Sequence, residues 1–134
     1  MQLSHGVIVA VADGTKLSLF RNGGSESDPK LTAIGSPEVG GDNKSAGSRH
    51  GSSSANPDDS RLEEDSFAAA TASLLNKMVL DGEIDSLIVV AAPKTLGELR
   101  KHWHKSLQAV LVDEIAKDLT GHSTNDIEAA LVKH

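Results

Sequence analysis

The apolar run from Leu87 to Ala92 limits what this chain can fold into more than any other segment. It reads LIVVAA, contains no polar residue and is short enough to be a strand. A strand that is apolar along its whole length is covered on both faces, as strands in parallel sheets are. We therefore place this segment inside a sheet that has helices packed against it.

The first part of the sequence predicts antiparallel strands. Val7 to Ala12 is apolar and β-branched, and Asp13-Gly14 behind it is a strong signal for a hairpin turn. Apolar and polar residues then alternate from Lys16 to Arg21, which we predict to be the second strand. A third strand is predicted from Lys30 to Ile34, where the same alternation lies between turn-forming residues.

Apolar residues recur at helical spacing after residue 59. A capping box from Ser60 to Glu63 predicts the start of a first helix, although Asn56 with Pro57 after it could cap an earlier turn. Gly82 predicts the end of this helix. The apolar residues between them recur every three or four positions, which is typical of a helix that lies on a sheet. They are Phe67, Ala70, Leu74 and Met78.

Two more helices and a strand are predicted after the central apolar strand. A second capping box, Thr95 to Glu98, opens a helix with three apolar residues on one side, Leu96, Leu99 and Trp103. A short helical turn leads from there into a last strand, Val112 to Ala116. Ser123 to Asp126 then caps a terminal helix.

This order of elements predicts an α/β fold. Strands that alternate with helices in the second half imply parallel pairing, and the opening hairpin adds antiparallel strands. We predict a mixed β-sheet of about five strands with helices packed on it. The whole chain, residues 1–134, is expected to form a single domain.

A segment from Gly35 to Asp59 interrupts this pattern. It is rich in Gly, Ser, Asn and Asp and has hardly a large apolar residue. Ordering it would cost backbone entropy that burial could not offset, so we predict a long flexible loop within the domain. Loops of this length are usually either functional or disordered, and both interpretations stay open.

Composition excludes several classes of protein. The chain has no cysteine, which rules out disulfides, thiolate zinc sites and cysteine nucleophiles and suggests a reducing compartment. No apolar run approaches the roughly 20 residues that cross a bilayer, and the start lacks a basic n-region. We therefore expect a cytoplasmic protein without membrane insertion. The scarcity of aromatic residues argues against binding of single strands by base stacking.

The sequence gives no catalytic constellation, metal site or cofactor site. His102 and His104 are two residues apart, which places them on different sides of a helix. No serine occupies a Gly-x-Ser-x-Gly elbow. A nuclease-like carboxylate set could be sought among Asp13, Asp85, Asp113 and Asp118, but a turn explains Asp13 and a strand entrance explains Asp85 more simply.

A concentration of positive charge follows the central strand, in a chain whose formal net charge is -6. Lys94 lies at the entrance of the helix, Arg100, Lys101 and Lys105 follow, and Glu98 opposes them. Ligands of open α/β sheets gather beyond the carboxyl ends of strands, where a helix start also favours anions. The alternative interpretation is the solvated face of an amphipathic helix.

Four stretches of the sequence resemble a known family. They are VADGTKLSLFRN, GSRH, APKTLGELR and KDLTGHS, which begin at Val11, Gly47, Ala92 and Lys117. With them the chain resembles the bacterial host attachment protein family, also described as a bacterial branch of the archaeal and eukaryotic release factors. The resemblance implies a fold similar to the middle domain of those release factors, which is related to the ribonuclease H-like group.

In true release factors a Gly-Gly-Gln loop promotes release of the nascent chain. The comparable loop here reads Gly40-Gly41-Asp42, so the glutamine is missing. The loop contains basic residues, among them Arg49 and His50, and these imply contact with ribosomal RNA or another polyanion through charge. The candidate residues for binding an anion or a partner are Arg49, His50, Lys94, Thr95, Arg100, Lys101, Lys105 and Lys117.

Two functions follow as expectations. The first is a non-catalytic cytoplasmic binding module that contacts the ribosome, an RNA or an acidic protein, with an indirect role in attachment to host cells, as the family name implies. The alternative is a hydrolase or nuclease that acts on RNA or peptidyl-tRNA. No cofactor is expected for either, and the sequence does not determine the oligomeric state.

Overall fold

The computed structural model describes residues 3–13, 16–26, 28–35, 59–119 and 121–133, and the side chains of residues 59–65 are outside this description. Its strands are β1 (Ile8–Ala12), β2 (Leu17–Asn22), β3 (Leu31–Gly35), β4 (Leu87–Ala91) and β5 (Leu111–Ala116). Its helices are α2 (Asp59–Leu80), α3 (Pro93–Arg100), α4 (Lys105–Val110) and α5 (Thr124–Lys133).

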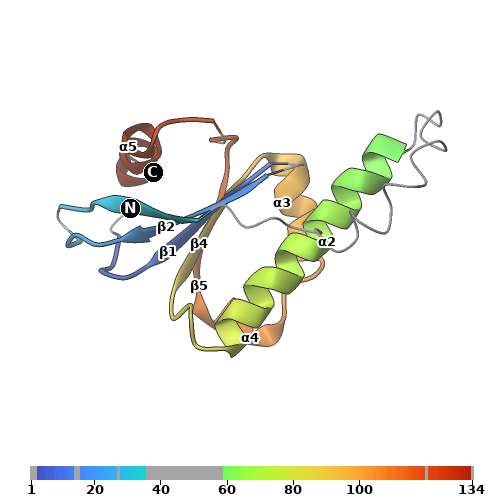
Figure 1. Cartoon of the computed structure of the whole chain (residues 1–134), viewed down its shortest axis with the longest axis horizontal. Coiled ribbons are helices and arrows are strands. Elements are labelled where there is room, and N and C mark those ends of the chain that lie inside the picture. Colours follow the sequence, from blue (N-terminus) through green and yellow to red (C-terminus); the bar gives the residue numbers. More distant parts are fainter. Residues whose placement is uncertain (1–2, 14–15, 27, 36–58, 120, 134) are drawn as a thin grey trace.

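Among the described residues, the strands form one sheet in the order β3-β2-β1-β4-β5 (Figure 1). β2 pairs antiparallel with β1 and β3, whereas β4 pairs parallel with β1 and β5. The predicted α/β class and the mixed sheet with packed helices are therefore confirmed. The arrangement is consistent with the release factor-like domain that the resemblance implied.

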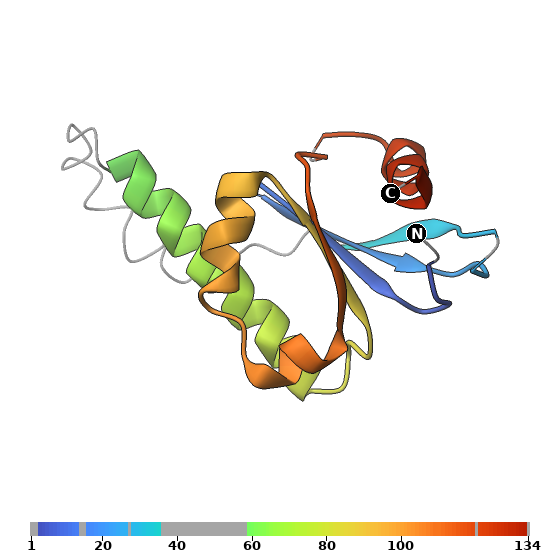
Figure 2. The same ribbon diagram turned by 180° about the vertical axis from the view of Figure 1, so that it is seen from behind.

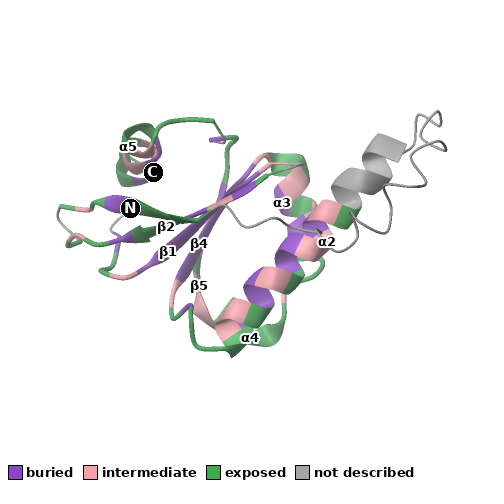
Figure 3. Ribbon diagram, viewed as in Figure 1, coloured by how far each residue is buried: buried purple, intermediate pink, exposed green. Residues whose placement is uncertain are grey.

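Helices cover both faces of this sheet. α2, α3 and α4 lie on one side and α5 lies on the other (Figures 1 and 2). Every residue of β1 and β4 is buried, so these two strands form the middle of the molecule (Figure 3). This agrees with the interpretation of Leu87 to Ala92 as a strand covered on both faces.

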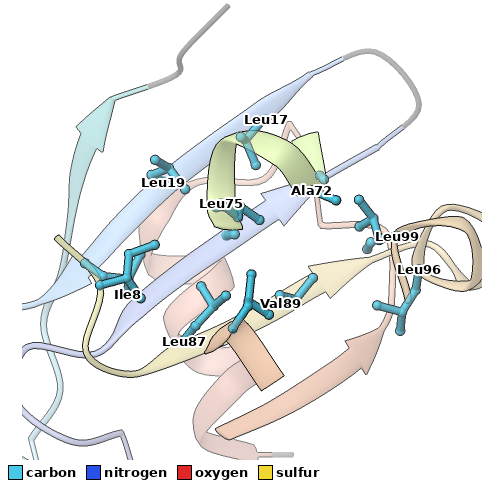
Figure 4. Close-up of a cluster of buried hydrophobic side chains, with 14 of the residues drawn as sticks. Ile8, Leu17, Leu19, Ala72, Leu75, Leu87, Val89, Leu96 and Leu99 are labelled. Carbon is cyan, nitrogen blue, oxygen red and sulfur yellow. The ribbon is translucent and has the colours of Figure 1, made fainter. Parts of the chain in front are cut away.

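Alternation along the strands divides the core in two. Ile8 of β1 and Val89 of β4 point toward α2, where they meet Leu75 (Figure 4). Val9 and Ile88, which are adjacent to Ile8 and Val89 in their strands, belong to the opposite cluster with side chains from α5. Burying a side chain of this size contributes about 1.5–3 kcal/mol, so both layers of helix are held mainly by apolar contact.

The end of α2 agrees with the sequence prediction. Gly82 has φ 82°, a left-handed conformation that glycine adopts without strain. The Gly82 N–H donates to the Val79 carbonyl at 3.1 Å and the Glu83 N–H donates to the Met78 carbonyl at 2.9 Å. These two bonds form a Schellman motif, which satisfies carbonyls that the last turn leaves without partners.

The predicted start of the next helix was wrong. α3 begins at Pro93 with Ala92 as its N-cap residue, and no side chain caps it. Proline fits the first helical position because its φ is fixed and it needs no donor there. Thr95 therefore lies inside the first turn and is half-buried, which corrects the capping box that we predicted from Thr95 to Glu98.

The predicted length of that helix was also wrong. α3 ends at Arg100, and Trp103 lies in the connection to α4, although it still packs against the first core cluster. Asn76 of α2 explains the interruption. Its Nδ2 donates to the His102 carbonyl at 3.0 Å and its Oδ1 accepts from the His104 N–H at 3.0 Å. The side-chain amide thus replaces the helical partners of these backbone groups.

Two other local predictions are confirmed. β1 and β2 form an antiparallel hairpin in which Ala12 lies opposite Leu17. The Lys16 N–H donates to Asp13 Oδ1 at 2.6 Å, so the Asp13 carboxylate serves the turn, as expected. At the other end of the chain, the Asp126 N–H donates to Ser123 Oγ at 3.1 Å, which caps α5.

The predicted loop from Gly35 to Asp59 lies almost wholly outside the described residues. Gly35 itself ends β3 and Asp59 begins α2, so the two predicted boundary residues belong to regular elements. No helix in the described part of the chain is both long enough and apolar enough to cross a membrane.

Candidate functional site

Three parallel strands end side by side at one edge of the sheet. Ala12 of β1 pairs with Ala91 of β4, which in turn pairs with Ala116 of β5. The chain therefore leaves these strands at neighbouring points, and α3 starts directly after the middle one. This is the carboxyl edge, where open α/β sheets hold their ligands.

Two of the predicted basic residues lie at this edge. Lys94 is in the first turn of α3, and Lys117 directly follows β5. Both residues are exposed. Because β4 and β5 are neighbours in register, two lysines that are far apart in the sequence follow the same edge of the sheet.

The exposed side of α3 continues from Lys94 along the helix. Leu96 and Leu99 are buried against the sheet, whereas Gly97 and Lys101 are exposed. Residues three or four apart share one side of a helix, so Lys94, Gly97 and Lys101 follow one another along the outer surface. With a rise of about 1.5 Å per residue, the two lysine positions are roughly 10 Å apart along the axis.

Arg100 is held against the edge strand β5. Its Nε donates to Glu114 Oε1 at 2.9 Å, and Trp103 Nε1 donates to the other carboxylate oxygen, Oε2, at 3.1 Å. The Arg100 side chain remains 56% exposed, whereas that of Glu114 is 19% exposed. Among the described residues, the bond to Glu114 uses only Nε of the guanidinium, so its terminal nitrogens stay available to an anion.

Lys101 also has an acidic neighbour. Its Nζ lies 3.0 Å from Glu98 Oε1, three residues back on the same helix. Arg100 and Lys101 are thus each paired with a carboxylate, one from β5 and one from the same helix. The pair between Lys101 and Glu98 is accessible to solvent, so it contributes little and exchanges readily with other partners, because water and salt screen it.

The remaining candidates do not join this group. Lys105 is exposed, but it begins α4, which leads into the amino end of β5. It therefore lies away from the carboxyl ends of the strands. Thr95 is half-buried within α3. The loop candidates, Gly40, Gly41, Asp42, Arg49 and His50, lie outside the described residues. We use the term basic face for Lys94, Arg100, Lys101 and Lys117.

Sequence reasoning missed Glu114, the residue that positions Arg100. Glu114 pairs with Val89, so its side chain lies on the face of the sheet that α3 covers. A charged residue at a helix-facing position of an edge strand is a recognisable signal. Its partners, however, lie on a separate element and could not be identified from spacing alone.

The described residues do not assemble a metal centre. No group of three or more His, Cys, Asp or Glu side chains lies close enough to hold an ion in this part of the chain. His102 and His104 are both exposed in the connection after α3. The side chains of the basic face can make ionic contacts and hydrogen bonds.

A family model matches almost the whole chain. Residues 6–131 match bacterial archaeo-eukaryotic release factor family 12. The chain belongs to this family. Its match extends from the residues before β1 into the terminal helix α5. Membership confirms the release factor part of the resemblance and indicates a domain related to translation. The family description does not mention host attachment. No curated protein matches the chain.

Proposed function

We propose that the protein is a non-catalytic, translation-related binding domain that contacts ribosomal RNA through the basic face. The observation that carries this proposal is the convergence of Lys94 and Lys117 at the carboxyl edge, with Arg100 and Lys101 farther along α3. Arginine and lysine side chains bind phosphate, and arginine can do so with two nitrogens at once.

The ion pair to Glu114 supports this role. A long arginine side chain loses conformational freedom when it binds, which lowers affinity. Here Nε is already fixed by Glu114 at 2.9 Å, so part of that loss has occurred before any partner arrives. The terminal nitrogens of the guanidinium can then bind a phosphate, since the Arg100 side chain is 56% exposed.

The charge of the whole chain opposes binding of a polyanion. Its formal net charge is -6, and Glu98 and Glu114 lie within the basic face itself. Binding must therefore depend on the local arrangement and should be strongly sensitive to salt. The proposal places the protein in the cytoplasm with the ribosomes, and any role in attachment to host cells would be an indirect result of an effect on translation.

No observation favours the alternative of a hydrolase or nuclease. Asp13 accepts a hydrogen bond from the Lys16 N–H, which accounts for a carboxylate at that position. Asp118 follows β5 at the same edge, but the described residues supply no third carboxylate or histidine to complete a site for a metal ion. We therefore do not propose a catalytic role.

Co-sedimentation of the purified protein with ribosomes tests the proposal. At about 50 mM salt the protein should sediment with ribosomes, and at about 200 mM most of it should be released. Digestion of the RNA should abolish sedimentation. The charge-reversal variant Lys94→Glu/Lys101→Glu should remain in the supernatant at both salt concentrations.

A matched control variant carries the same change in charge elsewhere. Lys77 forms an exposed pair with Asp81 at 3.3 Å, comparable to the pair between Lys101 and Glu98. Lys133 is an exposed lysine at the end of α5, on the other face of the sheet. If Lys77→Glu/Lys133→Glu lowers sedimentation as much as the reversal on α3, or if the natural protein does not sediment, the proposal is wrong.

A further inference from the structure

Gly97 lies in the middle of α3, on its exposed side between Lys94 and Lys101. Glycine is a poor residue for the interior of a helix, because it loses more backbone freedom on folding than alanine does. The protein therefore forms α3 with an unfavourable residue at its centre. A glycine at such a position calls for a physical reason.

The fold itself supplies no such reason at Gly97. A Cβ atom built there would have no described atom within 4 Å. Its φ is not in the positive range, unlike that of Gly82, where the backbone requires glycine. Gly24 gives a second contrast, since a Cβ there would collide with the backbone of Asp28. Alanine at position 97 would fit the folded chain without any adjustment.

We infer that Gly97 leaves α3 without a side chain so that the sugar-phosphate backbone of RNA can lie directly against the helix. Lys94 and Lys101 lie on either side of this position without a side chain, which we call the Gly97 gap. Each lysine can reach a phosphate as the RNA backbone crosses between them. This inference rests on the proposed function and adds to it the place and the manner of contact. A side chain at position 97 would hold the strand away from both ammonium groups.

The surroundings of Gly97 favour contact with the backbone of RNA rather than with its bases. Trp103 is the aromatic residue nearest to α3 in sequence, and it packs against the core and donates its N–H to Glu114. It is therefore not a platform on which a base can stack. Contacts to phosphate and sugar carry no direct sequence information, so binding should be independent of sequence.

The substitution Gly97→Ala separates this inference from a structural role. We expect the variant to be more stable, with a Tm higher by roughly 3 °C, because alanine favours the helix. We also expect it to bind poly(U) and poly(A) about tenfold more weakly at low salt, as measured by fluorescence anisotropy. Gly97→Gln, which also favours a helix but carries a longer side chain, should bind more weakly still.

Ser73→Ala is the matched control, since Ser73 is an exposed position of α2 outside the basic face. It should also stabilise the protein slightly and leave RNA binding unchanged. Equal binding by Gly97→Ala and the natural protein would overturn the inference and leave the proposed function standing. A loss of stability in Gly97→Ala would also overturn it, because the glycine would then serve the fold.

Two further outcomes identify a different failure. If the natural protein binds neither homopolymer nor ribosomal RNA, the proposed function fails and the inference fails with it. If it instead binds a ribosomal protein in a manner that RNA digestion does not affect, the occupant of the Gly97 gap is not RNA. A preference of more than about tenfold for one homopolymer would likewise contradict contact through the backbone alone.

Discussion

Arg100 at the end of α3 and Glu114 on β5 are joined by a hydrogen bond of 2.9 Å between Nε and Oε1. The same carboxylate accepts from Trp103 Nε1, so one side chain of the edge strand holds both the end of α3 and a residue of the connection to α4. Glu114 thereby combines a structural role with the positioning of a cation on the basic face.

Removing this carboxylate should destabilise the fold. For Glu114→Ala we expect a loss of about 2 kcal/mol in the free energy of unfolding, because the part-buried Trp103 N–H loses its acceptor. Arg100 should account for the smaller share, since it is more than half exposed and screened by solvent. Glu114→Gln keeps one acceptor oxygen and should cost about 1 kcal/mol. Chemical denaturation measures both values.

Glu83→Ala is the control for this prediction. Glu83 is exposed, and its side chain makes no hydrogen bond within the described part of the chain. Its substitution should change stability by less than about 0.5 kcal/mol. If Glu114→Ala changes stability no more than Glu83→Ala does, the junction of α3 and β5 does not depend on Glu114.

Asn76 should be required for the break between α3 and α4. Asn76→Ala leaves the His102 carbonyl and the His104 N–H without their partners, at an expected cost of about 2 kcal/mol. Asn76→Asp keeps an acceptor for His104 but cannot donate to His102, so it should also destabilise. Hydrogen exchange at the His104 amide provides a local measurement. Unchanged protection in Asn76→Ala would show that another group holds this connection.

Gly82 should respond to substitution in the opposite sense to Gly97. Alanine at position 82 must adopt φ near 82°, which costs about 1 kcal/mol in an L-residue. Gly82→Asn should cost less, because asparagine tolerates the left-handed conformation. Thermal unfolding of the two variants gives the comparison. Equal stability of Gly82→Ala and the natural protein would mean that the Schellman motif adds nothing to the end of α2.

Thr71 offers a site for stabilisation. Its side chain is fully buried on α2, and its hydroxyl has no hydrogen-bond partner among the described residues. Thr71→Val replaces the hydroxyl by a methyl group of similar size and should stabilise the protein by about 1 kcal/mol. Thr71→Ala removes the methyl group as well and should gain less or lose stability through the cavity. A destabilised Thr71→Val variant would show that the hydroxyl is satisfied.

Most of the fold followed from short stretches of sequence. Asp13 predicted the hairpin, Gly82 the end of α2 and Ser123 the start of α5, because each signal depends on hydrogen bonds between residues a few positions apart. The apolar strand β4 was predictable for a similar reason, since its composition alone requires cover on both faces. The overall order of elements then left few topologies to choose from.

The failures concern contacts between distant residues. The helix after β4 was expected to include Trp103, but Asn76, on a different helix, binds the backbone on either side of it. Its first turn was misplaced because Pro93 starts the helix without a side-chain cap, two residues before the capping box that we predicted.

The candidate surface shows the same division. The sequence by itself determined that lysines and an arginine follow the central strand and that a glycine interrupts their helix, since these facts depend on residue order and helical periodicity alone. Only the tertiary structure decided that Lys117 and Lys94 follow the same edge of the sheet and that Glu114 holds Arg100. Both relationships depend on the register between β4 and β5, which is set by the packing of two cores and not by any short stretch of the chain.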